Sequence, residues 1–268
     1  MEVGYNSDPG LLRELNEDSV LCSSFDLRTH LGTISAGLFI VADGMGGHSA
    51  GEIASDLATR TFYLQCISRL LSSLPNPPVS VLTAAFEKAN SNVFESARNR
   101  NLQGMGTTLT AALVVGGDIY VAHVGDSRCY IINTRETIQV TKDHSVVQQF
   151  IDAGIITPEQ AINHPRKNEI TRVLGYSADT TPDTYHLKLF SGDNILLCSD
   201  GLSGVLTSNK ISETVINALN PKQACLDLTA QANLSGGPDN IAVIVAKPPD
   251  LPYWQAAVTA ETSISIRE

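Results

Sequence analysis

The chain has 268 residues, of which 43% are hydrophobic and 17% charged, as in a folded globular protein of one large or two small domains. Its 18 basic and 28 acidic residues give a formal net charge of −10, which argues against a general nucleic-acid-binding protein, because such a protein needs a basic face. The N-terminus lacks the segments of a signal peptide, no apolar run has membrane-spanning length and the five cysteines are scattered, so we expect a cytoplasmic protein with reduced thiols and no membrane partner.

The first part of the chain predicts strands and then helices. Residues 1–25 indicate two short strands around a polar turn, with a charged run just before the second strand. The apolar run 38–42 predicts a buried strand that ends at Asp43 and is followed by glycines. Two stretches with helical spacing, 49–71 and 79–98, are expected to cover a sheet.

Residues 106–140 change to a strand pattern. Three apolar segments, 107–115, 119–124 and 129–132, are joined by very short turns. Strands with such short connections cannot be parallel neighbours, so we expect an antiparallel meander. Asp126 follows the second strand directly, as Asp43 follows the first buried strand of the chain.

The polar, turn-rich stretch 141–183 predicts an excursion from the sheet, of the kind that often carries recognition. Strands at 185–190 and 193–199 follow it. The second of them runs into Asp200 and a glycine, which repeats the pattern at Asp43.

The rest of the core is helical and then returns to a strand. Helices are expected at about 208–219 and 221–233, before a glycine-rich loop. Asp239 in that loop introduces the last strand, 241–246. The residues from 248 onward have no clear period and are interpreted as a C-terminal tail.

Five aspartates share one position in this pattern, at a strand end beside a turn: Asp18, Asp43, Asp126, Asp200 and Asp239. Such ends can converge on one rim of a sheet, and an all-oxygen site suits Mg²⁺ or Mn²⁺ rather than Zn²⁺. Two such ions can clamp a phosphoryl group, which a guanidinium also binds with matching geometry. The spacing alone leaves two interpretations equally open, a metal site and a set of unrelated loop aspartates.

Seven short motifs follow one another along the chain. They are Arg13…Asn16-Glu17-Asp18, Asp43-Gly44-Met45-Gly46-Gly47, Gly106-Thr107-Thr108, Gly125-Asp126-Ser127-Arg128, Thr141-Lys142-Asp143-His144-Ser145, Cys198-Ser199-Asp200-Gly201 and Gly237-Pro238-Asp239-Asn240. Each is weak alone, but in this order they resemble the metal-dependent Ser/Thr protein phosphatases of the PPM, or type 2C, family, in the form of its bacterial branch. The resemblance covers residues 1 to about 247.

The resemblance implies an α+β fold, a four-layer α-β-β-α sandwich of two antiparallel sheets flanked by helix pairs. A catalytic domain would span 1–247, with a flap at about 144–183 beside the site, and 248–268 would be the tail. The implied activity is hydrolysis of phosphoserine and phosphothreonine by attack of a metal-bridging water or hydroxide on the phosphorus.

The resemblance also implies a dinuclear centre of two tightly held Mn²⁺ or Mg²⁺ ions at one end of the sandwich. Asp43 would bridge the two ions, and the Gly44 carbonyl would bind one of them. Asp200 and Asp239 would hold the other ion.

Further positions carry over from the same motifs. Asp18, with Glu17, would hold metal-bound water. Asp126, with Asp200, would support a third, weaker ion. Arg13 matches the arginine that binds the phosphate.

One departure concerns the general acid. Eukaryotic members of the family have a histidine, proposed as the acid, where this chain has Met45. His48 is nearby and is interpreted as structural, and metal-bound water is the alternative acid. His164 in the flap is a candidate for contact with the substrate.

The implied partners are phosphorylated proteins, either a Ser/Thr kinase or the substrates of one, and the implied state is a monomer. Two alternatives stay open: a non-catalytic phosphoprotein-binding module on the same fold, and a narrow phosphatase for one regulatory protein. All predicted metal positions hold suitable ligands, which favours an active enzyme.

Overall fold

The computed structural model describes residues 1–29, 32–46, 50–72, 76–102 and 104–248. His48 and all but the first residue of the expected tail at 248–268 lie outside the described residues.

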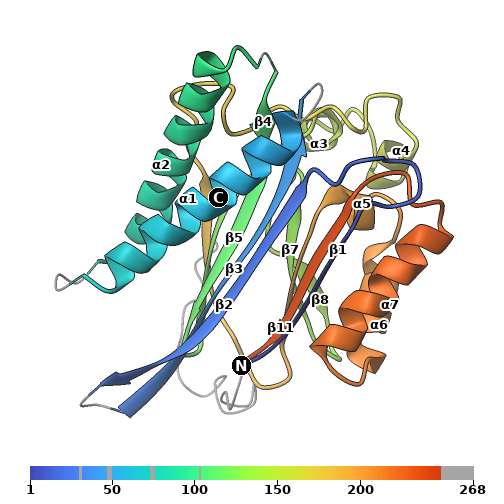
Figure 1. The fold of residues 1–268 in the computed structure, drawn as a ribbon. Helices are drawn as coiled ribbons and strands as arrows, with labels where there is room; N and C mark the ends of the chain where they lie inside the picture. The colour runs from blue at the N-terminus through green and yellow to red at the C-terminus, as the bar shows by residue number, and fades with distance from the viewer. Residues whose placement is uncertain (30–31, 47–49, 73–75, 103, 249–268) are drawn as a thin grey trace.

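Two antiparallel sheets form the centre of the molecule (Figure 1). The first contains, in spatial order, β1 (Glu2–Asp8), β11 (Ile241–Lys247), β10 (Asn194–Cys198), β7 (Arg128–Ile132) and β8 (Thr137–Gln139). The second contains β2 (Asp18–Thr29), β3 (Gly32–Met45), β5 (Leu109–Val115), β6 (Asp118–Val124) and β9 (Asp183–Lys188), with the two-residue β4 (Gly106–Thr107) paired to the end of β3.

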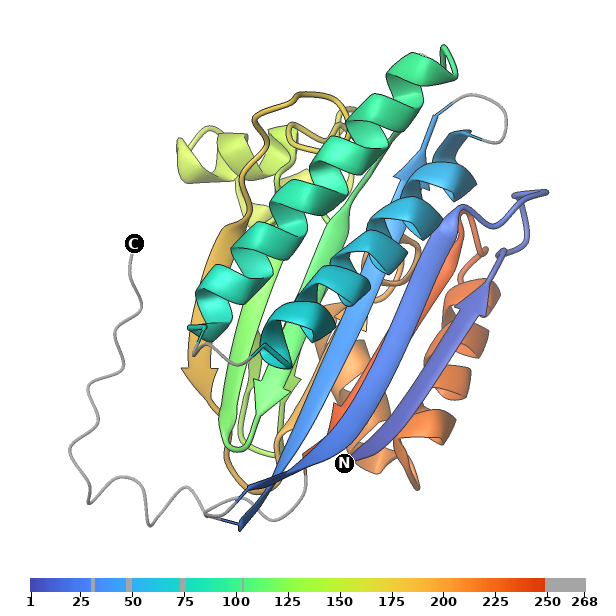
Figure 2. The same ribbon diagram turned by 60° about the vertical axis from the view of Figure 1, so that its left-hand side comes forward.

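Helices cover the outer face of each sheet, which confirms the predicted four-layer α+β sandwich (Figures 1 and 2). The pair α1 (Ala50–Leu70) and α2 (Pro78–Asn99) lies on the second sheet. The short α5 (Asp200–Ser203), with α6 (Ser208–Asn217) and α7 (Pro221–Leu234), lies on the first. Two small helices, α3 (Val146–Asp152) and α4 (Pro158–Ile162), belong to the excursion between β8 and β9.

Three apolar layers hold the four structural layers together. Strand β3 shows how alternation builds them, because side chains along a strand point to opposite faces. Leu38 and Ile40 pack under α1 and α2. Phe39 and Val41 point the other way, into the core between the sheets. A strand buried on both faces therefore runs straight toward Asp43, which lies at the end of this apolar run.

The expected antiparallel meander is wrong at its third strand. Strands β5 and β6 do pair, but β7 pairs with β10 and β8 in the other sheet. A short connection excludes a parallel neighbour in the same sheet, but it does not exclude a step across to the facing sheet. Gly125, with φ of 114°, turns the chain out of β6, whose free edge is taken by β9. Asp126 therefore lies on a crossing between the sheets.

Several strand boundaries also differ from the expectation. The segment 107–115 divides at Thr108, whose N–H donates to the Asp43 carbonyl at 2.8 Å, so that β4 pairs with the end of β3 while β5 pairs further along it. Asp18 does not precede a strand but opens β2, and β8 was not predicted because it is only three residues long.

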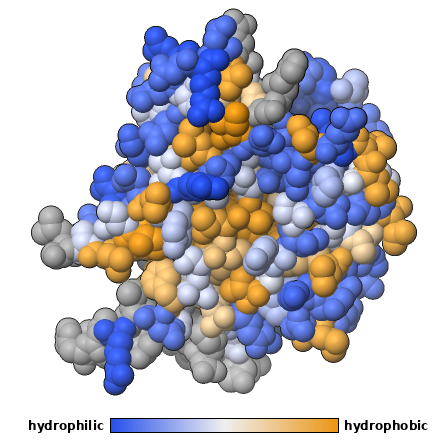
Figure 3. Space-filling model, viewed as in Figure 1, coloured by the Kyte–Doolittle hydropathy of each residue, from blue (hydrophilic) through white to orange (hydrophobic). Residues whose placement is uncertain are grey.

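The face in Figure 3 is largely hydrophilic, with apolar residues gathered between the two helix layers, over the strands. Met1, Val3 and Val20 are partly buried and pack against the core between the sheets. All five cysteines are unpaired. No helix in the described part of the chain combines the length and the apolar composition that a membrane crossing requires.

Candidate functional site

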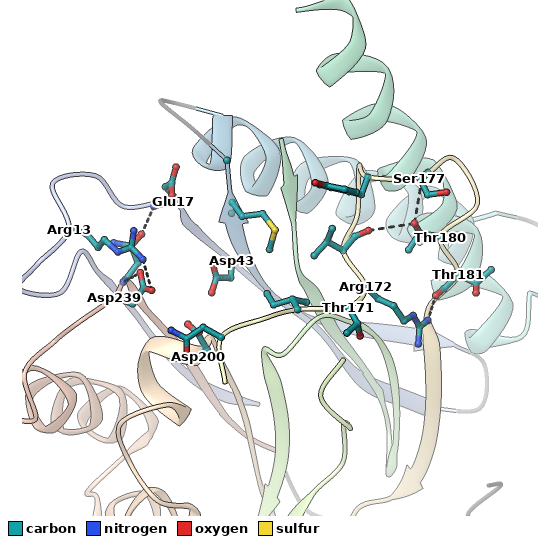
Figure 4. Close-up of a pocket in the computed structure, with 18 of the residues that line it drawn as sticks. Arg13, Glu17, Asp43, Thr171, Arg172, Ser177, Thr180, Thr181, Asp200 and Asp239 are labelled. Atoms are coloured by element: carbon teal, nitrogen blue, oxygen red, sulfur yellow. Dashed lines mark hydrogen bonds and ion pairs between the residues drawn. The ribbon is translucent and has the colours of Figure 1, made fainter. Parts of the chain in front are cut away.

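A cavity of about 810 Å³ opens at the end of the sandwich where β3 terminates (Figure 4). Six of the predicted site residues line it: Arg13, Glu17, Asp43, Gly44, Asp200 and Asp239. The facing wall comes from the return of the excursion, including Arg172, Ser177, Thr180 and Thr181. Asp43 lies between the two sides, as the close-up shows.

Both main-chain polar groups of Asp43, its N–H and its carbonyl, make hydrogen bonds to side chains. The Thr108 hydroxyl accepts from the Asp43 N–H at 2.9 Å, and the Thr107 hydroxyl donates to the Asp43 carbonyl at 2.8 Å. These bonds leave the Asp43 carboxylate free to face the cavity. Asp18 is the direct cross-strand neighbour of Asp43 on β2. Like charges in that position repel, so the pair requires a proton or a cation.

Asp18 and Asp126 lie behind the cavity wall, with 9% and 7% of their surface exposed. The Ser199 hydroxyl donates to Asp18 Oδ2 at 2.7 Å. Three aspartate oxygens shielded from solvent have no hydrogen-bond partner within the described residues: Asp18 Oδ1, Asp126 Oδ1 and Asp200 Oδ1. Buried carboxylate oxygens rarely stay unpartnered, and a positive charge would suit this cluster.

The carboxyl groups hold protons more tightly than usual. Burial, and after it the charges of neighbouring carboxylates such as Asp200, raises the pKa of Asp18 to about 8. The pKa of Asp43 is well above its ordinary value for the same two reasons, burial first. Burial and carboxylate neighbours likewise raise the pKa of Asp126 and Asp200. Without a cation, the fold cannot easily keep all of these groups ionised.

Arg13 and Asp239 form the opposite rim. An Arg13 guanidinium N–H donates to Asp239 Oδ2 at 2.8 Å, and both side chains remain partly exposed. The hydrogen bond and charge of Asp239 raise the pKa of Arg13. The pKa of Glu17 is raised, because the effect of burial exceeds the opposing effect of the Arg13 charge. The rim therefore presents one permanent positive charge beside several carboxylates.

Asn240 holds the loop that carries Arg13 and Glu17. Its Oδ1 accepts from the Glu17 N–H at 2.8 Å, and its Nδ2 donates to the carbonyls of Pro9 and Leu15, both at 2.9 Å. The side chain is 5% exposed, so these main-chain groups find no ready substitute in water.

Asn240→Ala is expected to lower the free energy of unfolding by about 2–4 kcal/mol, because three main-chain groups lose a buried partner. Denaturant unfolding monitored by circular dichroism measures it. Asn76→Ala, which removes a side chain bonded in an exposed part of the chain, is the control and should change stability by less than about 0.5 kcal/mol. Equal losses in the two variants would contradict the assigned role of Asn240.

Glycines let three segments meet at the end of β3. A Cβ at Gly44 would overlap the Gly51 carbonyl oxygen and would lie 2.6 Å from the Glu17 carbonyl oxygen. The Gly44 N–H donates to that Glu17 carbonyl at 3.1 Å. A side chain is therefore impossible here without moving α1 or the loop at Glu17, and the chain beside Asp43 stays close-packed.

The donor set fits a hard divalent cation. Carboxylate and carbonyl oxygens are the ligands that Mg²⁺ and Mn²⁺ prefer, and the unpartnered buried oxygens of Asp18, Asp126 and Asp200 are of this kind. In the described part of the chain, no three His, Cys, Asp or Glu side chains are already arranged to hold an ion. Main-chain carbonyls and water would have to complete any coordination sphere.

Two positions singled out in the sequence, His164 and Met45, lie in different places relative to the cavity. His164 is not among the described residues that line the cavity; its ring packs edge-on against Phe150, with centroids 5.6 Å apart, and its Nδ1 accepts from the Arg166 N–H. This contact with α3 holds the ring in the excursion. Met45 does line the cavity, but its thioether has no proton to donate.

Sequence reasoning missed the residues that support the site. Ser199, Thr108 and Asn240 had no role in it, although each stands inside one of the seven motifs, and Ser199 and Asn240 are next to a predicted ligand. The available signal was position: Ser199 precedes Asp200, Thr108 ends the Gly-Thr-Thr motif, and Asn240 follows Asp239.

Comparisons with known proteins bear on this geometry. The model of the protein phosphatase 2C family matches residues 26–235. The chain is 38% identical over 261 residues to the serine/threonine protein phosphatase PstP of Mycobacterium tuberculosis, a match covering 95% of this chain and 46% of that protein. This chain therefore spans about half the length of that relative.

Two more similar proteins are matched over nearly their whole length. The serine/threonine phosphatase stp of Listeria monocytogenes is 34% identical over 257 residues, which is 92% of this chain and 96% of that protein. The solved catalytic domain of PstP, in complex with two manganese ions, superposes with a TM-score of 0.76 at 36% identity and covers 91% of this chain and 96% of that domain.

Proposed function

The chain belongs to the protein phosphatase 2C family, and we propose that it is a metal-dependent phosphatase that hydrolyses phosphoserine and phosphothreonine in proteins. One observation carries the proposal most: a cluster of buried aspartates with unpartnered oxygens lies beneath a cavity whose rim holds Arg13. The same cavity is wide enough, at about 810 Å³, for a phosphorylated side chain and neighbouring residues.

Two Mn²⁺ or Mg²⁺ ions would be held by Asp43, the Gly44 carbonyl, Asp200 and Asp239. The similarity of this chain to the catalytic domain of PstP, which was solved in complex with two manganese ions, supports this assignment. When bound, such ions lower the pKa of water and neutralise charge on a phosphoryl group.

Further groups of the chain would serve the same centre from behind. Asp18 and Glu17 would accept hydrogen bonds from water at the site, and Asp126 would support a third, weaker ion. Asp18 and Asp126 are buried with an oxygen unpartnered within the described residues, which supports both roles. Glu17 lines the cavity directly.

Arg13 would bind the phosphate. Its guanidinium has further N–H groups beside the one given to Asp239, and this fork matches two phosphate oxygens. The ion pair with Asp239 aims the side chain at the cavity. Met45 cannot supply a proton to the leaving serine or threonine oxygen, so the acid must be another group or water.

We extend the proposal to the whole protein. Residues 1–247 would form the catalytic domain, with 144–183 as a flap, and the chain would act as a monomer on a Ser/Thr kinase or its substrates. Activity restricted to one regulatory protein is the narrower version. Comparing the phosphoproteomes of a deletion strain and its parent separates broad from narrow action.

The test uses the full chain with a phosphoserine peptide and p-nitrophenyl phosphate. Release of phosphate is expected with Mn²⁺ and should stop with EDTA or in Asp239→Ala, with the fold retained by circular dichroism. Binding of the phosphopeptide without turnover at any Mn²⁺ concentration would instead identify a binding module and overturn the proposal.

Arg13→Ala is expected to raise the KM for phosphate esters about tenfold to a hundredfold, because a charge-assisted bidentate contact is lost. Inhibition by inorganic phosphate should weaken by a similar factor. Arg60→Ala removes an exposed arginine that pairs with Asp56 on α1, and this control should leave both quantities within about twofold. An unchanged phosphate affinity in Arg13→Ala would remove Arg13 from the binding site.

A further inference from the structure

One polar side chain is buried on the inner face of α2. Asn90 is 1% exposed and stands in a row of apolar residues that includes Phe86, Ala89 and Val93. Burial of an amide among apolar neighbours is unfavourable unless its hydrogen bonds are made. The partners of Asn90 therefore indicate what the residue is for.

All three of those hydrogen bonds go to one short segment. The Asn90 Nδ2 donates to the carbonyls of Ser177 at 2.8 Å and Ala178 at 3.1 Å. Its Oδ1 accepts from the Gly175 N–H at 2.8 Å. The single amide thus bonds residues 175–178 through both of its N–H hydrogens and its oxygen. Three hydrogen bonds to one short segment fix the path of its main chain.

The segment is also closely fitted to its surroundings. Gly175 has φ of 85°, and a Cβ there would overlap the Val93 side chain on α2. The preceding residue, Leu174, exchanges two main-chain hydrogen bonds with Thr107, at 2.9 and 3.2 Å. The Thr107 hydroxyl in turn donates to the carbonyl of Asp43. The segment is therefore held between α2 and the strand end that carries Asp43.

The chain that follows forms a wall of the cavity. Tyr176, Ser177, Asp179, Thr180 and Thr181 all line it. Figure 4 shows Ser177, Thr180 and Thr181 on the side opposite Arg13 and Asp239, with Asp43 between them. A phosphorylated residue held at Arg13 would place its flanking peptide chain toward this wall.

We infer that Asn90 is a positioning residue for peptide binding: from the buried face of α2 it sets the wall at 176–181 against which the chain flanking the phosphorylated residue binds. This inference rests on the proposed function, whose metal and phosphate groups lie elsewhere in the cavity. A small aryl phosphate has no flanking chain, so its hydrolysis should depend on the wall much less than that of a phosphopeptide.

The test compares kcat/KM for a phosphoserine peptide with kcat/KM for p-nitrophenyl phosphate, both with Mn²⁺. In Asn90→Ala the ratio of the two is expected to fall about tenfold or more, since a displacement of the wall by about 1 Å is costly for a positioned substrate. The fall should lie mainly in the KM for the peptide. Asn92→Ala is the matched control, because Asn92 lies on the same helix but donates to Thr61 on α1, and its ratio should stay constant.

Two further measurements keep the inference testable if Asn90→Ala folds poorly. Gly175→Ala pushes the same segment away from Val93 without changing α2 and should lower the same ratio. Amide hydrogen exchange at Gly175 should accelerate in Asn90→Ala but not in Asn92→Ala, whether or not the protein is active. Equal losses on both substrates, or an unchanged ratio in Gly175→Ala, would overturn the inference. No hydrolysis of p-nitrophenyl phosphate by the wild type would instead overturn the proposed function.

Discussion

Asp43→Asn is expected to lower phosphatase activity by about a thousandfold or more and, at the same time, to raise the melting temperature of the metal-free protein by about 5 °C. The two effects have one cause. Asp43 is buried beside Asp18, its cross-strand neighbour, and burial and this neighbouring charge raise its pKa. Removing the charge relieves the repulsion and removes the group expected to bridge the ions.

Thermal unfolding in EDTA and hydrolysis with saturating Mn²⁺ measure the two halves of this prediction. Asp56→Asn is the matched control, since Asp56 is an exposed aspartate on α1 that pairs with Arg60 on the same helix. That variant should alter neither activity nor stability appreciably. A folded Asp43→Asn protein that keeps its activity, or whose metal-free form is less stable than the wild type, would contradict the assignment.

Saturating Mn²⁺ is expected to raise the melting temperature by about 10 °C at pH 8 and by clearly less at pH 5. Ligand at about a thousand times its dissociation constant stabilises by about 4 kcal/mol, and for a chain of this size each kcal/mol shifts the transition by about 2–4 °C. Protons compete with the metal for the same carboxylates, so metal binding stabilises the fold less at a pH where those groups are protonated.

The metal-free protein should show the opposite trend with pH. The pKa of Asp18 is raised from about 4 in the unfolded chain to about 8 in the fold, so the folded state binds more protons between these values. The stability of the metal-free form is therefore greatest below about pH 4, as far as this group decides it, and falls as pH rises toward 8. Denaturant unfolding in EDTA at several pH values measures the trend, and a stability that rises from pH 5 to pH 8 would rule it out.

The position of Asp43 was predictable because its cause is local. An apolar run that alternates between two cores needs no distant information to be identified as a buried strand, and the glycine after it indicates a close approach. The same reasoning located α1, α2, α6 and α7 to within a few residues, since their apolar spacing is written along the chain.

Local pattern failed at β7. Its connection to β6 is as short as that of a hairpin, so the sequence predicted a third strand of one sheet. Which sheet a strand joins depends on free edges: β9 already pairs with β6, and β10 pairs with β7. The place of the His164 ring also depends on tertiary structure, because contact with Phe150, made only in the folded excursion, decides where the ring lies.

The sequence by itself determined the kinds of element, the carboxylates and, through the order of its motifs, the family. Tertiary structure alone decided that Asp18 and Asp126 lie behind the cavity while Asp43, Asp200 and Asp239 face it. It alone also revealed the supporting side chains Asn240, Ser199 and Asn90. Their hydrogen bonds reach residues that lie 223, 181 and 87 positions away in the sequence, respectively. A hydrogen bond depends on distance in space, so contacts over such separations leave no periodic trace in the chain.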